Sequence, residues 1–475
     1  WSSDVCSSDL YSLKDARKFP VIVLIGGVEG GGRGETVNAL TSWMDPRHIE
    51  VHGIGDPSDE ELERPRFWRF WRALPPRGKI GIFFGSWYTW PIINSVMEEK
   101  RPHWARLKRR VSEINRFEQM LANEGALILK FWFHLSKKAQ RKRMKELKRD
   151  PLTRWRVTTK DESFFARYDR FVEVSAAVLG ETSPAHAPWV IVEGVDRRYR
   201  ELTVAQQLHD ALTYRLANPV VKPELTATPD PSPAIDARRT VLSSLDMKRK
   251  VTKAAYDKDL EKWQGRLALL ARHKRFADKS VVVVFEGNDA AGKGGAIRRV
   301  AGAFDARMVR VIPIAAPTDE EKSHPYLWRF WRHLPRHGNV AVFDRSWYGR
   351  VLVERVEKFC STWDWQRAYG EINDFEEEMA GHGIVVAKFW LAITKQEQLK
   401  RFKEREAVSF KHFKITEEDW RNRKQWDAYS DAVCDMVTHT STTRAPWTLV
   451  EANDKHYARI KVLKTLHDSI ERALG

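Results

Sequence analysis

The chain repeats itself, and this repeat constrains the fold more than any other feature of the sequence. The segment Trp68–Arg72 recurs as Trp328–Arg332, which is 260 residues further along. Ser86–Tyr88 recurs at the same spacing, and Lys130–Trp132 recurs as Lys388–Trp390 at a spacing of 258 residues. Two co-linear copies within 475 residues predict a duplicated domain rather than one large core.

The repeat divides the chain into three parts. We expect a first domain over residues 11–217, a linker over 218–238 and a second domain over 239–475. The linker carries prolines at 219, 223, 229, 231 and 233, and such a density favours extended chain. Residues 1–10 lack a starting Met and show no helical or strand period, so we expect a foreign or truncated leader outside the fold.

The composition indicates a polyanionic partner. The formal net charge is +17, which fits nucleic acid, acidic lipid or polyphosphate equally well. Three cysteines without a CxxC spacing predict a reducing, cytoplasmic setting and no structural zinc. No apolar run reaches eighteen residues, so we expect no membrane span.

The second copy alternates buried strands with helical stretches. Continuous apolar runs over 281–285, 340–343, 384–391 and 447–451 are typical of strands covered on both faces, and a charged stretch from about 245 to 275 is helix-like. This order predicts an α/β three-layer domain with a parallel sheet and right-handed crossovers.

A glycine-rich loop follows the first of these strands. It fits the phosphate-binding loop, in which backbone N–H groups, a lysine and the positive end of a helix dipole surround phosphate oxygens. Gly294 stands where a Ser or Thr normally offers a hydroxyl to magnesium. Asp289 either points away or helps to hold Mg²⁺ and orients the acceptor, and we favour the second interpretation. The loop residues are Gly287, Asn288, Asp289, Ala290, Ala291, Gly292, Lys293, Gly294 and Gly295.

A second acid follows the next buried strand. Asp344 would lie at the carboxyl edge of the sheet, beside the glycine loop, which matches the place of a Walker B aspartate on magnesium. Arg345 and Arg350 flank it and could bind phosphoryl oxygens. The alternative is that Asp344 caps the next helix while the arginines pair with surface acids.

The loop 287–295, the segment 328–331 and the segment 344–350 (DRSWYGR) resemble the polyphosphate kinase 2 family. The resemblance covers the second copy, and the duplication resembles the two-domain, AMP-phosphorylating class. It implies a thymidylate-kinase-like P-loop fold, Mg²⁺ as cofactor and a helical lid, here around 400–420 with its cations at 400–405 and 411–414. It also implies that Asp289 and Asp344 are catalytic acids and metal ligands, with Lys293, Arg345 and Arg350 on phosphates.

The first copy lacks these groups. Asp289 corresponds to Glu29, Lys293 to Arg33, Asp344 to Phe84 and Arg345 to Gly85. We therefore predict an inactive first domain with a structural or polyphosphate-guiding role. The tryptophans at 68, 71, 87, 328 and 331 persist in both copies, which favours packing in the core over stacking on nucleic acid, and leaves Arg69 or Arg329 for phosphates.

These observations predict transfer of the terminal phosphoryl group of inorganic polyphosphate to a nucleoside monophosphate, AMP to ADP. Three alternatives stay open: ADP or GDP as acceptor, an ATP-dependent nucleotide kinase, and a basic nucleic-acid-binding protein that only the net charge favours. We expect polyphosphate and an adenine nucleotide as partners, rather than nucleic acid or a membrane. The sequence does not set the oligomeric state and leaves a homo-oligomer open.

Overall fold

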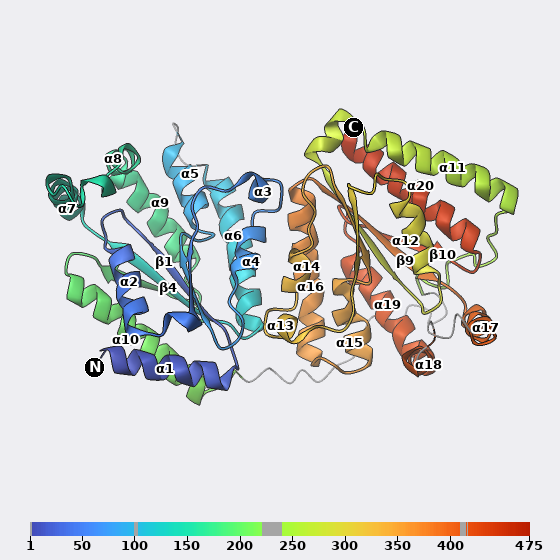
Figure 1. Cartoon of the computed structure of the whole chain (residues 1–475), viewed down its shortest axis with the longest axis horizontal. Helices are drawn as coiled ribbons and strands as arrows, with labels where there is room; N and C mark the ends of the chain where they lie inside the picture. The colour runs from blue at the N-terminus through green and yellow to red at the C-terminus, as the bar shows by residue number, and fades with distance from the viewer. Residues whose placement is uncertain (1, 99–102, 221–239, 409–414, 416) are drawn as a thin grey trace. The chain divides into compact units, whose positions relative to one another are not determined.

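The computed structural model describes residues 2–98, 103–220, 240–408, 415 and 417–475. The chain forms two compact units, and each contains its own parallel sheet with helices on both faces (Figure 1). This arrangement confirms the predicted α/β class and the duplication. From residue 221 onward the predicted linker 218–238 lies outside the described residues.

The second sheet is built around β6, which carries the glycine loop at its end. In the described part of the chain the strand order is β10-β9-β6-β8-β7, and every pair is parallel. Alternate residues of β6, among them Val281, Val283 and Phe285, pack into a core that includes residues of α11, α12 and α20. The strands are β6 (Ser280–Gly287), β7 (Val309–Pro313), β8 (Val340–Asp344), β9 (Ile384–Ala392) and β10 (Trp447–Glu451).

The helices of this unit cover both faces of the sheet. In Figure 1, α11 and α20 lie together on one face and α16 lies on the other. Along residues 253–474 the helices are α11 (Lys253–Leu270), α12 (Lys293–Ala301), α13 (Asp319–Lys322), α14 (Trp328–Trp331), α15 (Val353–Val356), α16 (Thr362–Gly381), α17 (Lys395–Glu406), α18 (Glu417–Lys424), α19 (Trp426–Thr440) and α20 (Lys455–Leu474), with 3₁₀ turns η3 (Lys274–Asp278) and η4 (Trp347–Val351).

The first unit repeats this plan. Its described strands run in the order β2-β3-β1-β4-β5. They are β1 (Val21–Gly27), β2 (Ile49–Gly53), β3 (Ile80–Phe84), β4 (Leu127–His134) and β5 (Trp189–Glu193). Along residues 2–217 the helices are α1 (Ser2–Ala16), α2 (Arg33–Trp43), α3 (Asp59–Leu62), α4 (Trp68–Ala73), α5 (Thr89–Met97), α6 (Trp104–Asn123), α7 (Lys137–Arg149), α8 (Thr159–Ala166), α9 (Tyr168–Glu181) and α10 (Arg197–Ala217), with 3₁₀ turns η1 (Pro46–His48) and η2 (Arg154–Arg156).

Residues 2–10 belong to α1, and Cys6, Leu10 and Leu13 are buried in the core of the first unit together with residues of α10. The expectation that this segment lacks a helical period and lies outside the fold is therefore wrong, while the expectation of a foreign or truncated leader stays a prediction. The spacing of the three buried residues, four and three positions, is helical, but the intervening Ser and Asp residues hide it from a reading of composition.

Sequence reasoning also missed one strand of the second sheet, β7, and predicted one helix longer than it is. β7 lies at the sheet edge, where only one residue of the strand is buried, so it shows no continuous apolar run. Its Pro313 suits an edge position because it donates no ladder hydrogen bond. The helix expected from about 245 begins at Lys253, because the Thr252 side chain accepts from the Ala255 amide and caps it.

One buried ion pair ties the sheet to the segment that follows β8. Lys388 of β9 donates to Glu376 of α16 at 2.6 Å and to the Thr440 carbonyl at 2.7 Å. Glu376 also accepts from the Trp347 indole at 3.0 Å and from the Tyr348 hydroxyl at 2.6 Å. Burial raises the pKa of Glu376 and lowers that of Lys388, so the pair depends on these direct contacts.

The first unit contains the same network. Lys130 contacts Glu118 at 2.7 Å and the Thr182 carbonyl at 2.6 Å, while Trp87 and Tyr88 donate to Glu118. The network accounts for the Ser-Trp-Tyr and Lys-Phe-Trp segments that both copies share. The tryptophans at 68, 71, 87, 328, 331 and 347 are all buried, which confirms their assignment to the core.

None of the helices in the described part of the chain combines the length and the apolar character that crossing a bilayer requires.

Replacing Lys388 by Met should strongly destabilise the second unit. The change leaves Glu376 buried without its cation, and removal of one partner of a buried pair costs about 3–5 kcal/mol. Lys400→Met is the matched control, because the Lys400 side chain is exposed and lies 4.0 Å from Glu404. It should cost less than about 1 kcal/mol. Urea unfolding followed by tryptophan fluorescence measures both, and equal losses would refute the role of the pair.

Candidate active site

The glycine loop joins β6 to α12 and presents a bare helix N-terminus. Gly292 is the N-cap residue, with φ of 106°, and no side chain caps the helix. The first N–H groups of α12 therefore lack a side-chain partner, and together with the helix dipole they favour an anion. Asn288 fixes the loop to the end of β9. Its side-chain oxygen accepts from the backbone N–H of Ile393 at 3.1 Å, and its backbone N–H donates to the Leu391 carbonyl.

Lys293 folds back onto the loop. Its ammonium donates to the Gly287 carbonyl at 2.7 Å and lies 3.4 Å from the Asn288 carbonyl. These contacts hold the cation at the loop, within the predicted phosphate site. Gly287, Asn288, Asp289 and Lys293 all line one open pocket of the second unit, of about 700 Å³.

Asp289 points into this pocket rather than into solvent. Its carboxylate accepts from the Asn422 side chain at 2.9 Å and lies 3.7 Å from a guanidinium nitrogen of Arg345. Its side chain is only 14% exposed. Of the two interpretations of Asp289 that the sequence left open, the structure favours the one in which it faces the site.

Arg345 sits among four acids. Burial alone would lower the pKa of Arg345, but the charges of Asp289, Glu286, Glu418 and Asp344 raise it. Asp289 and Asp344, although 55 positions apart in the sequence, thus both act on this guanidinium. Asp344 is the last residue of β8 and pairs in register with Phe285 of β6, at the same edge of the sheet as the loop.

Arg345 also has a strained backbone. Its φ is 64°, in the left-handed region that favours glycine, and Ala290 in the loop has a φ of 62°. The corresponding residues of the first unit are glycines, Gly85 with φ of 89° and Gly30 with φ of 77°. Both units therefore share the left-handed backbone conformation at these two positions. Only the second unit has residues with a Cβ atom there, which lowers its stability.

Some of the predicted site residues line the pocket and others do not. The described lining includes Gly287, Asn288, Asp289, Lys293 and Arg345, and it lacks Asp344, Arg350 and the loop residues Ala290, Ala291, Gly292, Gly294 and Gly295. Asp344 is close enough to Glu286 for its charge to raise the pKa of Glu286. Arg350 lies 2.9 Å from Glu354 in the next helical turn, and it is nearly buried.

Sequence reasoning missed Glu286, the acid directly before the loop. Burial raises the pKa of Glu286 to about 7, although Ser346, Lys293 and Arg345 act in the opposite direction. Ser346 donates to its carboxylate at 2.8 Å. The sequence does carry a signal for Glu286, because it directly follows the buried apolar run 281–285. A charged group at the end of such a strand needs a partner or a ligand.

Two residues of the predicted lid segment hold the glycine loop through hydrogen bonds. Arg401 of α17 is buried and donates to the carbonyls of Ala290 and Ala291, at 2.9 and 3.1 Å, so it holds the back of the loop. Gln398 of the same helix donates to the Asp289 carbonyl at 3.2 Å. The predicted lid cations at 411–414 lie outside the described residues.

The matching place in the first unit keeps one acid, Glu29, but has Gly26 and Phe84 at the positions of Glu286 and Asp344. Glu29 there pairs with Arg33 four residues on, and the Arg33 guanidinium lies 5.3 Å from the centre of the Phe84 ring. Phe84 occupies the position of Asp344 and offers no metal ligand. The charges of Glu29 and Arg33 therefore neutralise each other in the first unit.

Comparisons with known proteins agree with this geometry. The family model described as "Polyphosphate kinase 2 (PPK2)" matches the chain twice, over residues 8–219 and 250–474.

The chain belongs to the polyphosphate kinase 2 family.

Relatives within the family are similar over their full lengths. A polyphosphate:AMP phosphotransferase of Pseudomonas aeruginosa is 55% identical, over 98% of this chain and 93% of that protein. A protein of the same name from Acinetobacter johnsonii is 39% identical over 94% of this chain and 90% of its own length. A crystal structure of a polyphosphate kinase 2 from Pseudomonas aeruginosa superimposes with a TM-score of 0.88 at 52% identity, covering 99% of this chain and 94% of the other.

Replacing Glu286 by Gln should remove one pH dependence of stability. Because burial raises the pKa of Glu286 to about 7, the folded state binds a proton that the unfolded state releases near pH 4.5. This contribution to stability is present below pH 4.5 and is lost as the pH rises through 7. Between pH 5 and pH 8 the free energy of unfolding of the wild type should therefore fall by up to about 3 kcal/mol relative to that of the variant. Urea unfolding at both pH values, without substrate or metal, measures this, and parallel profiles would contradict it.

Arg345→Gly and Arg345→Ala form a matched pair that measures the backbone strain. Both remove the guanidinium, but only Ala keeps a Cβ in the left-handed region. The Gly variant should be more stable than the Ala variant by about 1 kcal/mol. Thermal unfolding compares the two, and a more stable Ala variant would show that the strain is absent.

Proposed function

We propose that the protein transfers the terminal phosphoryl group of inorganic polyphosphate to AMP, and that the second unit alone performs this reaction. The observation that carries the proposal is the pocket of the second unit, which is lined by Asp289, Lys293 and Arg345 of the loop and the segment after β8. Asp344 lies near enough for its charge to act on Arg345. Family membership and the names of the full-length relatives, polyphosphate:AMP phosphotransferases, support the same reaction.

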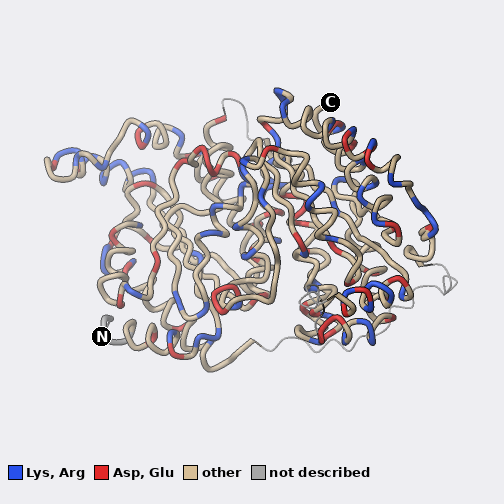
Figure 2. Tube along the Cα trace, turned by 45° about the vertical axis from the view of Figure 1, so that its right-hand side comes forward, with Lys and Arg blue, Asp and Glu red and all other residues tan. Residues whose placement is uncertain are grey.

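The charge of the molecule suits a linear polyanion. Figure 2 shows Lys and Arg residues distributed along the whole chain trace, and α7 carries a dense run of them. Polyphosphate has no bases, so its recognition requires cations and backbone amides rather than aromatic stacking. The loop amides, Lys293 and Arg345 supply these groups within the second unit.

The residues of the site fit a magnesium ion. The donors around Arg345 are carboxylates, which are the hard oxygen ligands that Mg²⁺ prefers, and Mg²⁺ needs only one or two of them beside substrate phosphates and water. Asp289 and Asp344 would hold the ion. Among the described residues, the group of three potential ligands within 4.8 Å is His467, Asp468 and Glu471 on α20, away from the loop. When bound, the metal ion would neutralise charge on the transferring phosphoryl group.

The chain's own residues do the positioning. The loop amides and Lys293 hold the phosphates of the donor chain, and Arg345 moves from Asp289 to the transferring group as that group arrives. A phosphate oxygen of AMP attacks the terminal phosphorus in line, the bridging P–O bond breaks, and the shortened polyphosphate leaves with the electron pair. No covalent intermediate with the protein is required.

The other functions considered have weaker support. Some family members that match about half of this chain are named ADP- or GDP-polyphosphate phosphotransferases, so the acceptor could carry one phosphate more. An ATP-dependent kinase would share the loop, and it is distinguished by the donor. Adding AMP with either polyphosphate or ATP and resolving the products separates these functions. Faster ADP formation with ATP would overturn the proposal.

Asp289→Asn and Asp344→Asn should each lower polyphosphate-dependent ADP formation by about 10²–10³, because each removes a preorganised charge from the transfer site. The measurement is the initial rate of ADP formation from AMP and polyphosphate. Near-full activity in either variant would refute its assignment.

Glu29→Gln provides the control in the first unit. It changes the residue that corresponds to Asp289 but lies outside the proposed site, so the rate should stay within about twofold of the wild type. A loss comparable to that of Asp289→Asn would place chemistry in the first unit and contradict the proposal.

A further inference from the structure

The first unit retains an open pocket where the second unit has its active site, but with a different lining. The pocket encloses about 750 Å³ of empty space, which includes solvent at its open side. It lies between the loop that follows β1 and the helices α8 and α9. Six of its lining residues are aromatic: Tyr88, Trp132, Phe164, Tyr168, Phe171 and Trp189.

The change of lining follows from substitutions at matching positions. Glu286 of the second unit corresponds to Gly26, Asn422 to Phe164 and Tyr429 to Phe171. Each substitution removes a charge or a polar group from the pocket wall. The pocket of the first unit has thus lost the groups that would handle phosphate and metal, while its volume has been kept.

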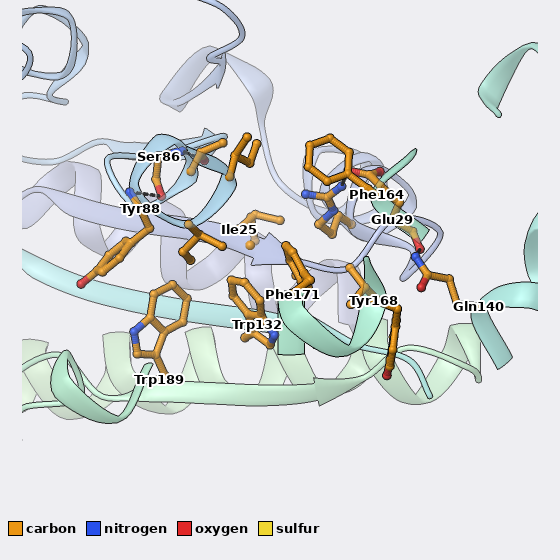
Figure 3. Close-up of a pocket in the computed structure, with 17 residues that line it drawn as sticks. Ile25, Glu29, Ser86, Tyr88, Trp132, Gln140, Phe164, Tyr168, Phe171 and Trp189 are labelled. Carbon is orange, nitrogen blue, oxygen red and sulfur yellow. Dashed lines mark hydrogen bonds and ion pairs between the residues drawn. The ribbon is translucent and has the colours of Figure 1, made fainter. Parts of the chain in front are cut away.

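Gly26 makes room for the central ring. A Cβ atom at this position would lie 2.9 Å from the Trp132 ring, so any larger residue would push the indole aside. Trp132 in turn stacks on Phe171, with ring centres 5.8 Å apart and an interplanar angle of 20°. Figure 3 shows these two rings near the middle of the pocket. The stacked pair forms an apolar part of the pocket lining.

Gln140, a buried polar residue of the pocket lining, has a side-chain oxygen that can accept a hydrogen bond from a ligand. Gln140 is 4% exposed and its amide nitrogen donates to the Glu29 carbonyl at 3.0 Å, but its side-chain oxygen has no hydrogen-bond partner among the described residues. In the second unit the matching Gln398 oxygen accepts from Arg423 at 3.1 Å. Phe165 replaces that arginine in the first unit.

The pocket is also nearly neutral. Glu29 and Arg33, the charged residues of its lining, form an ion pair with each other. A ligand that suits this pocket is therefore flat and aromatic, and it carries an N–H donor instead of depending on charge.

We propose that the pocket of the first unit binds the aminopurine ring of an adenine nucleoside, stacked on Trp132 and Phe171 with its amino group directed to Gln140. The choice of a nucleoside rests on the proposed function in one respect, namely that the matching pocket of the second unit takes an adenine nucleotide. The first unit is then a second nucleoside site rather than a vestige.

Photolabelling with 8-azidoadenosine tests the site in the full chain. After illumination, peptides from 127–134 and 159–181 should carry the label, and adenosine should protect them. Inosine lacks the amino group and should protect at least tenfold less well. Phe171→Ala should weaken protection by adenosine about tenfold, since loss of a stacking ring is typically worth that much. Gln140→Leu should weaken it without removing a ring.

Tyr429→Ala is the matched control, because Tyr429 is the counterpart of Phe171 in the second unit. It should reduce labelling of the second unit and leave that of the first unchanged. Label confined to the second unit, or first-unit label that Phe171→Ala and Gln140→Leu both leave unchanged, would overturn the inference. Labelling needs no polyphosphate, so a failure of the proposed function, seen as absent ADP formation, is observed separately.

Discussion

The buried pair between Lys388 and Glu376 is the interaction on which the active site depends. It joins β9, α16 and the end of α19 to Trp347 and Tyr348, which directly follow the segment that carries Asp344 and Arg345. A charged pair removed from water is stable only when every partner is in place, so this network permits one arrangement of these elements. The carboxyl edge of the sheet is positioned as a consequence.

Duplication separates this framework from the chemistry that it positions. Both units keep the network, the parallel sheet and the left-handed turns after their first and third strands in sequence order. The second unit places Ala290 and Arg345 in conformations that favour glycine, and it buries Glu286 at a raised pKa. Strain and buried charge are typical of sites that act on ligands. The first unit has glycine at all three positions, which removes these costs together with the catalytic groups.

The sequence predicted those parts of the fold that have a local signal. Buried strands showed as runs of valine, and the loop was recognisable from its glycines, its lysine and its flanks. The edge strand β7 was missed because half-exposed strands have no continuous apolar run. The helix α1 was missed because Ser and Asp separate its buried residues.

Within the site, contacts between distant residues could not be predicted. Asn422 reaches Asp289 from 133 residues further along the chain, and Arg401 reaches Ala290 across 111. The sequence around Asn422 and Arg401 does not distinguish them from the other polar residues of the charged helices α18 and α17. The positions of Asp289, Asp344 and Lys293 could be expected from the sequence because each lies in the glycine loop or at the end of a buried strand, while their roles stay predictions.

The central claim is that one framework serves two units while the metal-dependent chemistry belongs to the second. Anomalous diffraction from crystals grown with AMP, polyphosphate and Mn²⁺ in place of Mg²⁺ tests it most directly. The account predicts an anomalous peak ligated by Asp289 and Asp344, with phosphates along residues 287–295. A peak held by other side chains, or one beside Glu29 and Phe84, would contradict it.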